Sequence, residues 1–147
     1  MSDAYNLHRF LDAQELVHDT VLAELRAGRK SSHWSWFIFP QIAGLGHSAM
    51  AQQFAIGSLD EATAYLQHPV LGQRLRECTQ LVLNVEGRTI EEIFPYPDNL
   101  KFRSCMTLFM SATLDNTLFK NALHKYFDGQ PDQSTFDILA QHHSQRP

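Results

Sequence analysis

The sequence predicts an all-α fold, a single compact globular domain of six to eight helices over residues 1–147. Apolar residues recur at spacings of three and four along most of the chain, which is the period of one helix face. Residues that start and stop helices bracket these stretches. The alternation of apolar and polar residues that is typical of strands occurs only briefly, from Trp34 to Phe39.

The first helix is expected over residues 7–27, with Gly28 as a left-handed C-cap. One polar residue, Gln14, interrupts its apolar face. A buried amide needs hydrogen-bond partners, so we expect Gln14 to hold the backbone of the segment that follows the helix, with ligand binding as the alternative. The face consists of Phe10, Gln14, Val17, Val21 and Leu25.

Cap residues place the helices in the middle of the chain. Ser48 is a fair N-cap for a short helix through residue 54. Ser58 and Thr89 each have a glutamate three positions on, the pattern of a capping box. We expect helices over 58–68, 69–86 and 89–94.

A central helix is predicted over residues 98–113, because apolar residues surround much of its circumference. Asp98 is its expected N-cap. Asn116 is expected to cap the next helix, which ends at Gly129, and a final helix spans about 133–142.

Composition and charge exclude several classes of protein. The net charge of −4 argues against a nucleic-acid partner, since such proteins usually carry a basic face. No apolar run is long enough to span a membrane, and the first residues do not resemble a signal peptide. Cys78 and Cys105 are isolated, which favours buried free thiols and a cytoplasmic location. The oligomeric state stays open.

An aromatic segment over residues 29–46 is the most informative part of the chain. It holds both tryptophans and a pair of cations between two helical stretches. Its rings either pack as core or line a binding site, and both apply if one ring is inside and another outside. Trp34 or Trp36 would then stack on a planar ligand, while Arg29, Lys30, Ser31 and Ser32 hold a phosphate.

The glycines at 44 and 46 precede a predicted helix start, whose backbone N–H groups can bind an anion. We favour the alternative, a plain turn followed by a cap. We predict a small phosphate-containing ligand, no cofactor and no metal site, since the histidines lack helical i,i+4 pairing. The predicted ligand-binding residues are Gln14, Arg29, Lys30, Ser31, Ser32, Trp34, Trp36, Gln41, Gly46, Ser48 and Ser104.

Three residues are candidates for acid–base or electrostatic catalysis. Asp98 and Lys101 lie one helical turn apart, where a lysine beside an acid in a partly dry pocket can grip an anion or take part in a reaction. His33 is the histidine within the aromatic segment. The sequence does not settle whether the protein is an enzyme.

The string His-Trp-x-Trp-Phe-Ile-Phe-Pro-Gln over residues 33–41 resembles the bacterial "domain of unknown function 1810" family. Further matching strings lie at 10–14, 44–48, 61–75 and 98–109, so the resemblance covers nearly the whole chain. It implies a compact, mainly helical fold and no established activity.

The order of the Phe-x-x-Ala-Gln helix, the His-Pro-x-Leu helix and the Asp98 loop also resembles the NAD- and ADP-ribose-associated domain. That resemblance implies removal of ADP-ribose from modified bases, an N-glycosidase reaction. Asp98 or Lys101 would then serve the ribose C1 centre, whose transition state resembles an oxocarbenium ion. The competing hypothesis is a non-catalytic interaction or structural module whose aromatic segment is entirely core.

Overall fold

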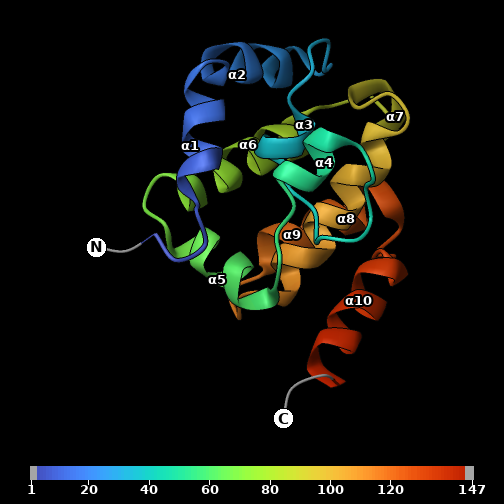
Figure 1. The fold of residues 1–147 in the computed structure, drawn as a ribbon. Coiled ribbons are helices and arrows are strands. Elements are labelled where there is room, and N and C mark those ends of the chain that lie inside the picture. Colours follow the sequence, from blue (N-terminus) through green and yellow to red (C-terminus); the bar gives the residue numbers. More distant parts are fainter. Residues whose placement is uncertain (1–2, 145–147) are drawn as a thin grey trace.

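The computed structural model describes residues 3–144, and in that part of the chain ten helices follow one another (Figure 1). The all-α prediction is confirmed. The helices outnumber the expected six to eight because the short turn at 35–38 is helical and the first helix is divided. The remaining residues of the predicted 1–147 domain lie outside the described range. The helices are α1 (His8–Glu15), α2 (His18–Ala27), α3 (Ser35–Ile38), α4 (Ala49–Gln53), α5 (Leu59–Gln67), α6 (Leu71–Asn84), α7 (Ile90–Ile93), α8 (Asp98–Ser111), α9 (Thr117–Phe127) and α10 (Gln133–Ser144).

The single helix expected over residues 7–27 is wrong at its centre. α1 ends at Glu15 and α2 begins at His18, with Val17 between them outside helical geometry (φ −129°, ψ 0°). Figure 1 shows the two helices meeting at an angle. No Gly or Pro marks the break, so tertiary packing explains it. α1 lies against α3 whereas α2 packs on α6, and a straight helix would not reach both.

α8 is the central helix, as predicted. It packs against α5, α9 and α10, and also against the short helices α3 and α7. Its residues Phe102, Cys105, Met106, Leu108 and Phe109 are at most 1% exposed. These side chains join one continuous hydrophobic cluster that extends to every part of the described fold.

Three of the predicted N-caps are confirmed. The hydroxyls of Ser48, Ser58 and Thr89 each accept a backbone N–H three residues on, and Thr89 with Glu92 forms a complete capping box. The Ser58 box is only half made. The Glu61 carboxylate accepts the N–H of Gly57 and pairs with Arg9 instead.

Two other predicted caps are wrong. The residue before α8 is Pro97, whose ring has no acceptor to cap the helix, and Asp98 is the first helical residue. Its carboxylate is taken by two lysines instead. Asn116 flanks α9 without a cap bond, and its amide donates to the Met110 carbonyl. Asp98 thus pairs with Lys30 from a distant segment, whereas Asn116 bonds a carbonyl only six residues earlier.

The aromatic segment crosses the middle of the fold. The brief alternation from Trp34 to Phe39 becomes the one-turn helix α3, whose neighbours Trp34 and Phe39 are at most 2% exposed. The Phe39 ring meets Phe102 of α8 edge-on with centroids 5.0 Å apart, and Trp34 meets Phe94 in the same way at 6.2 Å. The inner half of the segment is therefore core.

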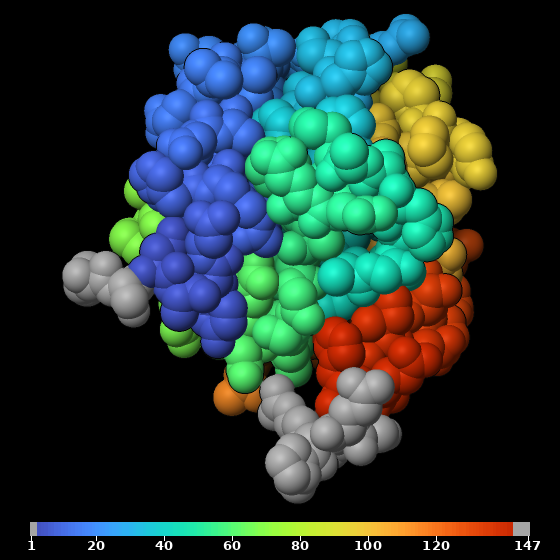
Figure 2. All heavy atoms as spheres, in the orientation of Figure 1, coloured from blue at the N-terminus to red at the C-terminus, as the bar shows by residue number. Residues whose placement is uncertain are grey.

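After α3 the chain runs as a loop beside α10 (Figure 2). Gly44 lies there with a positive φ of 108°, and a Cβ at this position would be 3.3 Å from the Ile138 side chain. An isolated parallel bridge joins Ile42 to Ile56 and closes this loop. Among the described residues, no helix has the length and apolar character to cross a membrane.

Candidate functional site

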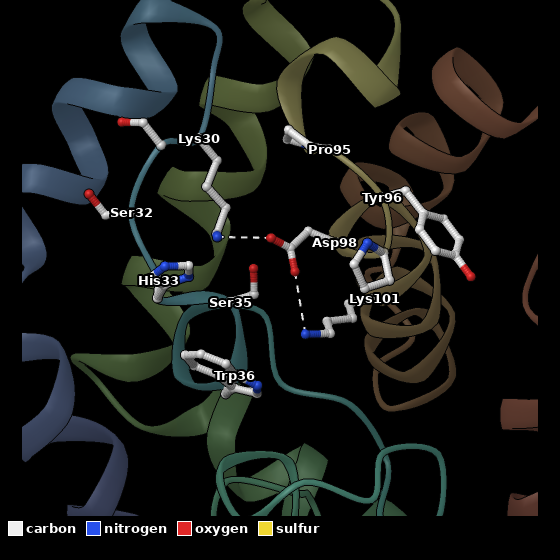
Figure 3. A pocket seen from close by; sticks show the side chains of 11 residues that line it. Lys30, Ser32, His33, Ser35, Trp36, Pro95, Tyr96, Asp98 and Lys101 are labelled. Atoms are coloured by element: carbon white, nitrogen blue, oxygen red, sulfur yellow. Dashed lines mark ion pairs between the residues drawn. The ribbon is translucent and has the colours of Figure 1, made fainter.

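A pocket of about 360 Å³ opens where the segment after α2 faces the connector between α7 and α8 (Figure 3). Its wall joins residues 30–36 to residues 95–101, which are about sixty positions away in the sequence. The lining residues are Lys30, Ser31, Ser32, His33, Ser35, Trp36, Pro95, Tyr96, Pro97, Asp98 and Lys101.

Two lysines converge on one carboxylate in this pocket. Lys30 Nζ lies 2.8 Å from Asp98 Oδ2, and Lys101 Nζ lies 3.4 Å from Asp98 Oδ1. Figure 3 shows both side chains pointing at the acid from opposite walls. The Lys30 side chain is 7% exposed, and its backbone N–H donates to the Ile93 carbonyl at 2.8 Å. The position of Lys30 is therefore fixed at both ends.

The two lysines hold Asp98 in its charged form. Burial acts to raise the pKa of this carboxyl, but the hydrogen bond and charge of Lys30, followed by those of Lys101, lower the pKa below its ordinary value. Two positive charges therefore flank one negative charge, which leaves the cluster with a net charge of +1.

Trp36 forms the flat wall of the pocket. Its ring lies 5.2 Å from Lys101 Nζ and 6.5 Å from the His33 ring. Unlike Trp34, it is only partly buried. An indole face beside a cation is a good surface for a planar ligand.

Glu24 of α2 holds the loop that carries the pocket wall. Its carboxylate accepts the backbone N–H groups of Ser31 and Ser32, the Ser32 hydroxyl and the Trp34 indole N–H, at 2.6–3.0 Å. Burial acts to raise the pKa of Glu24, but these hydrogen bonds outweigh it and lower the pKa to about 2. Sequence reasoning missed Glu24, since nothing local distinguishes it from a solvated helix residue.

The structure brings together seven of the predicted site residues. Asp98, Lys101 and His33 line the pocket, and so do four of the predicted ligand-binding residues: Lys30, Ser31, Ser32 and Trp36. One expected role changes, because the Ser32 hydroxyl donates to Glu24 and is not free to hold a phosphate.

Trp34 is the main correction to the predicted site. Its side chain is 0% exposed and packed on aromatic core residues, so it cannot stack on a ligand. Gln14 is also buried, and its amide donates to the Phe37 carbonyl at 2.7 Å and to the Tyr65 hydroxyl at 3.1 Å. Gln14 thus holds the aromatic segment, as preferred from the sequence. Ser104 donates to Leu100 O and Asp132 Oδ2, away from the pocket.

Four more predicted ligand-binding residues lie outside the pocket. Arg29 is exposed and Gln41 is half-buried, with its carbonyl accepting the Ile56 N–H. Gly46 packs closely on Ala51, where a Cβ would approach to 2.6 Å. Ser48 caps α4. The glycine turn is therefore explained by packing and capping.

Ser35 and the Pro95-Tyr96-Pro97 connector line the pocket and were not predicted. The proline-flanked tyrosine was interpreted only as an extended connector, yet Tyr96 is 76% exposed at the pocket rim. A large exposed ring between two prolines was the available signal.

The cysteines do not contribute to this site. Cys78 and Cys105 are free and buried, as predicted. Burial raises the pKa of the Cys78 thiol to about 12 and that of Cys105 well above its ordinary value. Both stay as unreactive thiols. Among the described residues, His, Cys, Asp and Glu side chains form no group of three able to hold a metal ion.

A model of the family described as "Protein of unknown function (DUF1810)" matches residues 4–139. The chain belongs to this family. Its structure is similar to the crystal structure of the conserved hypothetical protein Rv1873 from Mycobacterium tuberculosis, with a TM-score of 0.93 and 54% sequence identity. The match covers 94% of this chain and 99% of that one. Among curated proteins, none matches the chain.

Membership of the DUF1810 family confirms the resemblance seen in residues 33–41 and explains the shared helical fold. It brings no activity with it, because neither the family description nor the related structure names one. What the protein does must therefore be inferred from the chemistry of the Lys30–Asp98–Lys101 pocket.

Proposed function

We propose that this pocket binds a small ligand that joins a phosphate-type anion to a planar ring, as nucleotides and ADP-ribose do. The observation that carries the proposal is the convergence of Lys30 and Lys101 beside the partly exposed Trp36. Each part of such a ligand then has its own partner in the pocket.

The anion would lie against the two ammonium groups. A lysine has three N–H donors, and Asp98 takes one from each of the two lysines. The other donors of Lys30 and Lys101 have no further carboxylate partner among the described residues. Two strong donors beside a pocket are the arrangement that recognises a phosphate oxygen.

The ring would lie on Trp36. Trp36 lines the pocket, and Lys101 Nζ lies 5.2 Å from the centroid of its ring, which places a positive charge beside the indole. His33 lies at the rim and offers a second flat surface and a ring N–H. The volume of about 360 Å³ is in the range that holds a small molecule.

The chemistry proposed for this ligand is cleavage of an N-glycosidic bond. In that reaction the bond between ribose C1 and the base nitrogen breaks, a water oxygen adds to C1, and a proton goes to the leaving nitrogen. A carboxylate held in its charged form, such as Asp98, stabilises the positive charge at C1. Lys101 or His33 would donate the proton.

One observation favours the competing function, a non-catalytic module. Trp34, Phe37, Ile38 and Phe39 are all at most 6% exposed, so most of the aromatic segment is core. This explains the aromatic content without a ligand. It does not explain why Lys30, Lys101 and Trp36 meet at a pocket.

The test is a thermal-shift series with NAD, ADP-ribose and the common nucleotides. We expect a ligand to raise the melting temperature, since binding to the folded state alone stabilises it. Lys101→Met and Trp36→Ala should abolish that increase. Lys120→Met is the matched control, because Lys120 is exposed on α9 and away from this pocket.

If no ligand in the series raises the melting temperature of the wild-type protein, the binding proposal is wrong. Release of free base, measured by chromatography after incubation with the bound ligand, tests the glycosidase step separately. Asp98→Asn should bind the ligand yet release no base.

A further inference from the structure

We propose that Asp98 makes the pocket selective for ligands whose phosphate carries one negative charge, as in a phosphodiester, over a terminal phosphate that carries two. This inference rests on the proposed function and adds the charge class of the ligand.

The carboxylate of Asp98 is close to any anion that the pocket would hold. A ligand oxygen hydrogen-bonded to Lys30 Nζ or Lys101 Nζ lies at most about 6.6 Å from an Asp98 oxygen. At that separation two negative charges repel each other appreciably, because the surroundings are only partly solvated. The two ammonium groups therefore have to balance both the Asp98 carboxylate and the ligand phosphate.

Three donors of the loop are not available to a second negative charge. Ser31 and Ser32 would supply two backbone N–H groups and a hydroxyl, but Glu24 already accepts all three. Glu24 thus occupies these three donors with a carboxylate from the protein itself. Lys30 and Lys101, opposed by Asp98, are the cations that line the pocket.

The charge balance follows from these contacts. A phosphate with one charge neutralises the net +1 of the Lys30–Asp98–Lys101 cluster. A phosphate with two charges leaves one of them without a partner, and desolvation of a doubly charged group is far more unfavourable. Replacing Asp98 with a neutral residue changes the net charge of the cluster to +2, which favours the dianion more than the monoanion.

The experiment compares ligands that differ only in phosphate charge. The probes are the 5′-monophosphates of adenosine, guanosine, cytidine and uridine, each paired with its methyl ester, titrated calorimetrically at about pH 7.5. The monophosphate is mainly doubly charged there, since its second pKa is about 6, whereas the ester is singly charged. For the nucleoside that the pocket accepts, we expect the methyl ester to bind at least about fivefold more tightly than the monophosphate.

Asp98→Asn should strengthen binding of the monophosphate more than binding of its ester. The ratio of the ester's affinity to that of the monophosphate should therefore fall by about fivefold or more. The control is Asp115→Asn, which changes the net charge equally. Asp115 is exposed and lies past the far end of α8, on the order of 20 Å from Asp98. It should leave the ratio unchanged.

A second measurement uses the wild-type protein alone and does not depend on the folding of a variant. At about pH 5.5 the monophosphate takes up a proton and becomes a monoanion, so its affinity should approach that of the ester.

The outcomes separate this inference from the proposed function. Failure of every probe to bind overturns this inference, and if NAD and ADP-ribose also give no thermal shift, it overturns the proposed function as well. Binding with equal affinity for monophosphate and ester at both pH values overturns the charge selectivity and leaves the ligand site standing. Tighter binding of the monophosphate at pH 7.5 also overturns the selectivity.

Discussion

Two largely buried cations of this protein look alike until their surroundings are compared. Arg9 and Lys30 each lie 2.8 Å from a carboxylate, Glu61 and Asp98 respectively, and their side chains are 16% and 7% exposed. Arg9 also donates to four backbone carbonyls, those of Tyr5, Asn6, Gln53 and Ala55. Lys30 has the Trp34 ring and a pocket beside it.

The difference indicates which of the two is structural. A guanidinium has five N–H donors, and Arg9 directs all of them at protein acceptors, joining α1 to the loop before α5. Lys30 keeps donors that face a pocket. A buried cation whose donors are all used holds a fold together, whereas one with donors left over beside a pocket is a candidate for ligand binding.

The largest effect on stability is expected for Arg9→Met. The change leaves the Glu61 carboxylate without its partner and removes the donors to four carbonyls, so the free energy of unfolding should fall by about 3 kcal/mol. Urea denaturation measures it. Arg26→Met, at an exposed position in the last turn of α2, should change the value by less than about 0.5 kcal/mol. A loss for Arg9→Met no greater than for Arg26→Met would contradict the structural role.

Lys30→Met should lower the free energy of unfolding by a smaller amount, about 2 kcal/mol, because Lys101 still balances Asp98. The same substitution should remove the ligand-induced increase in melting temperature, which Arg9→Met should leave in place. If both variants kept the ligand response, the contrast between the two cations would be unfounded.

The pH dependence of stability tests what holds the Lys30 side of the pocket. The pKa of Glu24 is lowered to about 2 from an ordinary value near 4.5, so its charged form stabilises the fold above pH 4.5. That contribution is lost as the pH falls from 4.5 toward 2. Glu24→Gln should therefore be about 1–2 kcal/mol less stable than wild type at pH 7. The two should converge near pH 2, and a difference that is constant with pH would argue against the hydrogen-bonded carboxylate.

The smallest effect on stability is expected for Lys101→Met. Lys101 is 25% exposed, and its distance of 3.4 Å from Asp98 is longer than that of Lys30. The free energy of unfolding should change by about 0.5 kcal/mol or less, while ligand affinity drops. If Lys101→Met lowered the free energy of unfolding as much as Lys30→Met, the two lysines would stabilise Asp98 equally, and Lys101 would not be available for a ligand.

Local signals in the sequence predicted most of the elements. Gly28 ends α2 in a left-handed conformation, and Thr89 with Glu92 caps α7, because both devices act within a few residues. The break at Val17 carries no such signal. Asp98 shows the same limit, since it was expected to cap α8 but is its first helical residue, and a lysine from another segment pairs with the carboxylate.

For the site, the sequence identified the segment but not which of its residues face outward. Trp34 and Trp36 are two positions apart and chemically equal, yet the helical turn α3 and the Trp34–Glu24 hydrogen bond put one inside and leave the other partly exposed. Such a choice depends on the direction of the backbone against α2 and α8. Composition and spacing do not contain that direction.

By itself, the sequence determined the helical class, most helix ends and the family, because periodicity, caps and long matching strings are local properties of the chain. Only the tertiary structure decided that Lys30 meets Asp98, that Glu24 occupies the donors of the loop, and that a pocket lies between residues 30–36 and 95–101. These contacts join residues up to about seventy positions apart. They exist only because packing of the aromatic core brings the two segments together.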